Sequence, residues 1–210
     1  MSLLTLRIFL ILGIVGHTLN YWCDRVLSIT PNGRITIDTM KDINDESKMA
    51  SLFKGVNSDI PFKSAMLGTL ALVLEFFGYF SIAFYVWNYS KILGTIMFAA
   101  AAIFTIFGSG HHVKYGLGVW IFIKGGLDKK SYSMLNELYN KFPITKLAYA
   151  GYFIYIIILM TAICMGVCNL AIWSLVFTVL PVFLVLSPFK IIGTLHISSV
   201  ITFIGWLFII

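Results

Sequence analysis

The chain has 210 residues, of which 59% are hydrophobic and 11% are charged, less than half of the roughly 25% charged residues typical of soluble proteins. Its mean hydropathy is +0.92, and long apolar stretches recur along its whole length, which excludes a soluble helical domain with polar helix faces. The formal net charge of +6 lies mostly beside these stretches, which favours membrane orientation over nucleic-acid binding.

Six apolar stretches are long enough to cross a membrane as helices. In chain order they are residues 4–26, 63–88, 92–123, 145–167, 169–187 and 189–209. The last three are joined by very short turns, which makes them antiparallel neighbours. The connections are too short to form a separate soluble domain. The sequence therefore predicts an all-α fold, a single polytopic transmembrane helical bundle over residues 1–210.

Two connections are long, residues 27–62 and 124–144. Each contains apolar residues at helical spacing, and in the first of them Asn44-Asp45-Glu46 is typical of a helix start. Both are predicted to form short amphipathic helices at the membrane interface.

With six spans, the two long connections emerge on the same side of the membrane. Most lysines and arginines flank that side, whereas Arg7 and Lys91 flank the opposite one. The excess of positive charge predicts that the long connections are cytoplasmic and that both termini are outside.

Ionisable side chains inside or at the edge of the predicted spans are candidates for function, because a charge in hydrocarbon costs roughly 2.5–3.5 kcal/mol on insertion scales. Six are predicted as catalytic candidates: His17, Asp24, Glu75, His111, His112 and His196. His111 and His112 point about 100° apart on a helix, so at most one is expected to point fully into a site, and the choice between them stays open. For any single histidine, a plain interhelical hydrogen bond is the alternative.

The positions of these groups place them in the half of the bundle nearest the long connections. Asp24 closes the first span, His17 lies about 10 Å deeper, and His196 lies about 9 Å from the same surface. We therefore predict a polar cavity that opens toward the long connections and is covered by the two short helices. Four further side chains are predicted to contact a substrate there: Asn20, Lys63, Lys114 and Tyr115.

Imidazole and carboxylate groups together can bind a divalent metal such as zinc, iron or manganese, with a coordination position left for water or substrate. The predicted metal ligands are His17, Asp24, His112 and His196. Without a metal, the same groups can act as a general acid and base. Their spacing matches none of the sequence motifs of known metal or nucleophile sites, so the reaction stays open.

Four short patterns are similar to those of a known group of proteins. They are Gly16 to Asp24 at the end of the first span, Lys63 with Gly68 at the start of the second, Gly108 to His112 in the third, and Pro188 with Gly193 before the last. Together they resemble a family of small bacterial six-helix membrane proteins catalogued only as a domain of unknown function. The resemblance covers nearly the whole chain. It implies the six-helix topology, a bacterial plasma-membrane location and a role for Asp24 together with a histidine of the third helix, but no activity.

Three functions are compatible with these features. The first is an intramembrane enzyme that acts on a lipid- or isoprenoid-like substrate, for which membrane lipid or another amphiphilic molecule would be the partner. The second is a proton- or cation-coupled transporter or channel, which needs a polar path to the opposite side; that side has few ionisable residues. The third is a haem protein with two axial histidines.

Overall fold

The computed structural model describes residues 1–36 and 44–210; residues 37–43, which belong to the predicted connection 27–62, lie outside the described part. The protein is an all-α bundle with a two-residue antiparallel strand pair after the first helix. Its elements are α1 (Leu3–Ser28), β1 (Ile29–Thr30), β2 (Gly33–Arg34), α2 (Glu46–Phe53), α3 (Asp59–Tyr89), α4 (Lys91–Lys124), α5 (Lys129–Lys141), α6 (Ile144–Cys164), the 3-10 helix η2 (Ile172–Phe177), α7 (Val179–Leu186), the 3-10 helix η3 (Ser187–Phe189) and α8 (Thr194–Ile209).

Four helical stretches in the described part of the chain are long and apolar enough to cross a membrane: α1, α3, α4, and the stretch Lys129–Cys164 that contains α5 and α6. Helices α1, α3, α4 and α6 match the first four predicted spans to within four residues, whereas the fourth apolar stretch begins earlier than predicted because it also includes α5. At 1.5 Å per residue, the 34 residues of α4 extend over about 51 Å, well beyond the roughly 30 Å of a hydrocarbon core.

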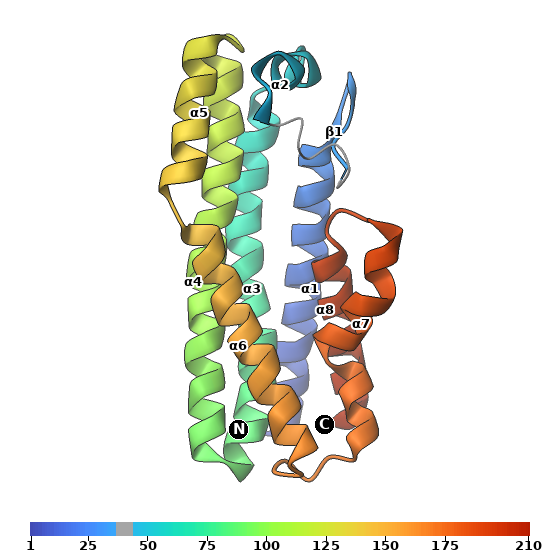
Figure 1. Cartoon of the computed structure of the whole chain (residues 1–210). Helices are drawn as coiled ribbons and strands as arrows, with labels where there is room; N and C mark the ends of the chain where they lie inside the picture. Colours follow the sequence, from blue (N-terminus) through green and yellow to red (C-terminus); the bar gives the residue numbers. More distant parts are fainter. Residues whose placement is uncertain (37–43) are drawn as a thin grey trace.

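Figure 1 shows the long helices side by side, with both termini at one end of the bundle and with α2 and α5 at the other. Helix α1 packs on α3 and α8, α3 packs on α4, and α4 packs on α6. At the end away from the termini, Met49 and Phe53 of α2 and Leu135 of α5 bury themselves against Val119 and Phe122 of α4. The two short helices therefore cover that end of the bundle.

Side-chain caps explain where several helices begin. The Asp45 carboxylate accepts hydrogen bonds from the backbone N–H groups of Ser47 and Lys48, as expected for the predicted helix start at this position. Asp128 and Ser131 form a reciprocal capping box at the start of α5. Ser90 alone separates α3 from α4, which makes these two helices a tight antiparallel hairpin.

The region of the fifth and sixth predicted spans differs from the prediction. The fifth is broken into η2 and α7, and the sixth begins only at Thr194, so α8 has 16 residues and extends over about 24 Å. The cause of the first break is Pro181, which has no N–H to donate to the carbonyl of Phe177 in a continuous helix. The indole N–H of Trp206 donates to that carbonyl instead, at 3.0 Å.

Helices α1 and α3 approach so closely that glycine is required between them. A Cβ atom at Gly16 would lie 2.6 Å from the backbone nitrogen of Glu75 and 2.7 Å from the carbonyl oxygen of Ala71. Both contacts are with backbone atoms, which cannot rotate away. This close approach brings the His17 side of α1 against the Glu75 side of α3.

Gly16→Ala is expected to lower the free energy of unfolding by about 1–3 kcal/mol, because the added methyl group forces two backbones apart. Thermal unfolding in mild detergent, followed by circular dichroism, measures the effect. Gly110→Ala is the matched control: the atoms nearest its added Cβ belong to the Ile144 side chain, which can shift. Equal losses in both variants would contradict the role of the Gly16 contact.

Candidate functional site

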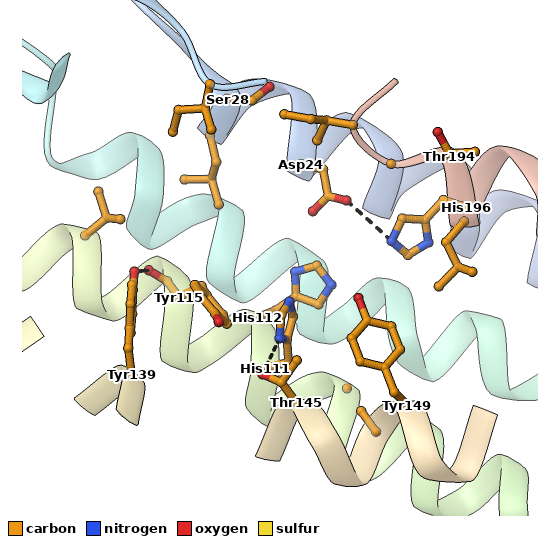
Figure 2. Close-up of a pocket in the computed structure, with 18 of the residues that line it drawn as sticks. Asp24, Ser28, His111, His112, Tyr115, Tyr139, Thr145, Tyr149, Thr194 and His196 are labelled. Atoms are coloured by element: carbon orange, nitrogen blue, oxygen red, sulfur yellow. Dashed lines mark hydrogen bonds and ion pairs between the residues drawn. The ribbon is translucent and has the colours of Figure 1, made fainter. Parts of the chain in front are cut away.

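A cavity of about 720 Å³ lies between α1, α4, α6 and the loop before α8. Its far end is bounded by Met49 and Phe53 of α2 and by Leu135 and Tyr139 of α5. Most of its wall is apolar, and polar side chains from α1, α4, α5, α6 and α8 also line it (Figure 2). The cavity therefore combines a large apolar surface with a small set of ionisable groups.

The cavity lies beside the unwound start of α8. Figure 1 shows that α7 and α8 stop short of the end that carries α2 and α5. The loop that joins them contributes residues 191–193 to the cavity wall, together with Phe183 and Ser187. Gly193 has a φ of +80°, and a Cβ on it would lie 2.7 Å from the Tyr21 ring, so a bare backbone lets α8 begin next to Asp24.

Asp24, His112 and His196 lie near one another in the cavity lining, with His112 across from Asp24 and His196 (Figure 2). His196 Nε2 lies 3.6 Å from Asp24 Oδ2, and the ring centres of His112 and His196 are 6.5 Å apart. One ligand atom from each of the three residues can be chosen so that all lie within 4.8 Å of one another. Gly68 makes room for His112, because a Cβ there would lie 2.5 Å from its Nδ1 atom.

A second group lies deeper, behind His196, and consists of His17, Glu75 and His196. His17 Nδ1 lies 3.0 Å from His196 Nδ1 and 3.1 Å from Glu75 Oε1, and His196 Nδ1 lies 3.5 Å from the same oxygen. Asn20 Nδ2 donates to Glu75 Oε1 at 2.6 Å. Glu75 and Asn20 are fully buried and His17 is 1% exposed, so only His196, at 9% exposed, connects this group with the cavity. His196 belongs to both groups, with one ring nitrogen in each.

Hydrogen bonds continue from His17 into the bundle core. Its Nε2 atom lies 2.8 Å from the Tyr79 hydroxyl, which lies 3.2 Å from the Ser199 hydroxyl. Ser199 in turn lies 2.9 Å from the hydroxyl of Tyr152. Sequence reasoning missed these three residues because it started from groups that are charged near neutral pH, and an uncharged tyrosine or serine in an apolar stretch does not stand out. A usable signal was present, since Tyr79 is four residues from Glu75 on the same helix face.

The other predicted site residues lie outside the cluster of Asp24, His112 and His196. His111 lines the cavity, but its Nδ1 bonds to the Thr145 hydroxyl at 2.8 Å and its ring packs on Tyr115, which also lines the cavity. Asn20 binds Glu75 in the deeper group rather than facing the cavity. Lys114 donates to the backbone carbonyls of Tyr139 and Phe142, which joins the end of α5 to α4.

Lys63, predicted to contact a substrate, is exposed and is absent from the cavity wall formed by the described residues. The four predicted metal ligands are also not a single cluster. They divide between the deeper group, which contains His17, and an outer group of Asp24, His112 and His196 at the cavity; His196 belongs to both.

The model of one protein family matches residues 1–209 of the chain. The chain belongs to DUF6796, a family of unknown function. The resemblance to an uncharacterised family is thereby confirmed over the whole chain. Asp24 and His112, a histidine of the third long helix α4, lie in one group, as the resemblance implied. Comparison with curated proteins and with solved structures finds no match.

Proposed function

We propose that the protein is a multi-pass membrane enzyme that acts on a lipid- or isoprenoid-like substrate held in the cavity. The observation that carries this proposal is that one cavity of about 720 Å³ has largely apolar walls and is also lined by three neighbouring ionisable groups, Asp24, His112 and His196. An amphiphile fits such a space with its chain against the apolar wall and its polar end at the three ionisable groups.

The four long helices are proposed to span the membrane, and the six predicted spans then become four full spans and one broken hairpin. Helices α7 and α8 form that hairpin, which enters from the side of the termini. Both short helices, α2 and α5, would lie at the opposite interface, over the mouth of the cavity. The lysines and arginines near that end favour a cytoplasmic location for it.

The cavity groups suit acid–base or metal-assisted chemistry. His196 is held between Asp24 and Glu75, so its ring orientation is set on both sides. His112 lies across from it and is 8% exposed, which leaves it accessible from the cavity. A positioned acid or base of this kind contributes typically about 10²–10⁴-fold in rate.

Transport is less well supported than catalysis. A transporter needs a polar path from the cavity to the side of the termini. The space on that side is filled by buried apolar side chains, among them Leu6, Leu10, Phe203 and Trp206. His17 and His196 do not suit a haem as its two axial ligands, because such ligands lie on opposite faces of a flat ring, whereas these two rings approach each other to 3.0 Å.

The test is a lipidomic comparison. Protein purified in mild detergent is incubated with a total extract of membrane lipids, and mass spectrometry identifies any species that is consumed. His112→Ala is expected to reduce the rate of consumption by about 10²–10⁴-fold, as expected for loss of an acid–base group. Ala148→Trp, which fills the cavity from α6, is expected to reduce lipid binding as well as turnover.

Lys130→Ala, on the exposed surface of α5, is the control and should leave turnover unchanged. Consumption that persists in both His112→Ala and Ala148→Trp would contradict the enzyme proposal. So would a function that appears only across sealed vesicles, since that result would point to transport.

A further inference from the structure

The deeper group has the shape of a metal-binding site. Its three inward-facing atoms are His17 Nδ1, His196 Nδ1 and Glu75 Oε1, separated by 3.0, 3.1 and 3.5 Å. Ligands that are 2.0–2.1 Å from one metal ion, at angles between octahedral and tetrahedral, lie about 2.9–3.4 Å from one another. The three atoms thus have nearly the separations of one face of a coordination polyhedron.

The outer nitrogens of both histidines already have oxygen partners. His17 Nε2 lies 2.8 Å from the Tyr79 hydroxyl, and His196 Nε2 lies 3.6 Å from the Asp24 carboxylate. If each Nε2 carries the proton and points it at its oxygen partner, each Nδ1 is left with a free lone pair directed at Glu75. Metal-binding histidines are oriented in this way, with the second ring nitrogen held by a hydrogen-bond acceptor.

Two buried oxygen atoms beside the group lack a partner. Among the described residues, Glu75 Oε2 and Asn20 Oδ1 are buried side-chain atoms with no hydrogen bond. Both belong to fully buried residues. Buried oxygens without a donor are costly and rare, so each calls for an explanation. A cation between the imidazoles would explain both oxygens, because its positive charge would stabilise oxygen atoms that no N–H group reaches.

The charges are also suitable. Two carboxyl groups, Glu75 in the group and Asp24 beside it, can supply the two negative charges that balance a divalent cation in a low-dielectric interior. Lys114, the one buried lysine among the described residues, donates to backbone carbonyls of α5 and of the loop after it, and it forms no ion pair with either carboxylate.

We propose that His17, Glu75 and His196 bind one divalent transition-metal ion, with Asp24 and Tyr79 orienting the two histidines. Two imidazoles and one carboxylate are the ligand set of zinc, iron(II) and related ions and leave coordination positions open. His112 and Asp24 are not ligands in this arrangement. The site does not depend on the proposed enzymatic activity, because metal content is measured without a substrate.

The test measures metal binding directly. The full-length protein is purified in mild detergent, stripped with a chelator and titrated with Zn²⁺, with Co²⁺ as a spectroscopic probe. The expected result is about one metal per chain and a visible Co²⁺ absorption band typical of mixed nitrogen and oxygen ligands. A protein that binds neither ion after stripping and reloading would overturn the proposal.

Variants distinguish the deeper group from the outer one. His17→Ala and Glu75→Gln are expected to abolish stoichiometric binding, whereas His112→Ala and the control His111→Ala are expected to retain it. Tyr79→Phe removes only a hydroxyl and is expected to weaken affinity by about 10–100-fold, as for other orienting groups. Loss of binding in His112→Ala with retention in His17→Ala would assign the metal to the outer group and overturn the proposal.

Folding of each variant is followed independently by circular dichroism and by its elution profile. If His17→Ala or Glu75→Gln does not fold, Tyr79→Phe still decides the question, since Tyr79 contacts the deeper group and is not part of the outer one. Unchanged affinity in a folded Tyr79→Phe variant would count against the deeper site.

Discussion

Glu75→Ala is expected to lower the free energy of unfolding by about 3–5 kcal/mol, the cost of removing one member of a buried, paired set of ionisable groups. The Glu75 carboxylate is fully buried and is the shared partner of Asn20, His17 and His196. Alanine leaves the Asn20 amide and two imidazoles without that oxygen in a region with no solvent to replace it. Denaturant unfolding in mild detergent, followed by circular dichroism, measures the loss.

Glu137→Ala is the matched control for this experiment. Glu137 forms an ion pair with Lys141 one turn further along α5, but both side chains are more than half exposed. Exposed pairs of this type contribute about 0–1 kcal/mol, so this variant should be nearly neutral. A similar destabilisation in the two variants would contradict the view that the Glu75 cluster holds α1, α3 and α8 together.

Phe203→Ala is expected to lower the free energy of unfolding by about 3 kcal/mol, at the lower end of the range for buried aromatic residues. The Phe203 ring is fully buried and packs 5.3 Å from the His17 ring and 5.0 Å from the Tyr79 ring, measured between ring centres. It also fills the space over Gly13 and Gly78 where α1 and α3 meet. Its removal leaves a void beside the deeper group. The effect should be at the lower end because detergent solvates a phenyl group better than water does.

Phe208→Ala, on the same helix, is the matched control: it removes the same phenyl group from an exposed position. Phe208 is 85% exposed, so its removal creates no internal void and should change the unfolding free energy by less than about 0.5 kcal/mol. The measurement is a thermal or denaturant transition of both variants under identical detergent conditions. If Phe208→Ala were as destabilising as Phe203→Ala, the packing of α8 against α1 would not be the cause.

The four long apolar stretches could be predicted from hydropathy because each is a continuous apolar run at least as long as a membrane span. The short helices α2 and α5 were also predictable, from an aspartate cap and a stripe of apolar residues. The break between η2 and α7 was not. Pro181 lies in a continuous apolar run, and the partner that satisfies the freed carbonyl of Phe177 is Trp206, a residue 29 positions away.

The sequence predicted most residues of the candidate site, but not which of them contact one another. The cost of burying charge singled out His17, Glu75 and His196, since few ionisable residues lie in apolar stretches. Which of them touch depends on helix rotation and on close approaches such as the one at Gly16, and one sequence does not determine these. The prediction placed Glu75 apart from the metal ligands, whereas the geometry puts its carboxylate between His17 and His196.

The deeper group joins the two ends of the polypeptide. His17 comes from the first helix and His196 from the last, 179 residues later. During synthesis, α1, α3 and α4 leave the ribosome before α8 and can pair with one another first. Until then Glu75 and His17 have each other but lack the second imidazole. The order of translation therefore completes the deeper group only once α8 has been made, and a chain that stalls before α8 would lack the histidine that both groups share.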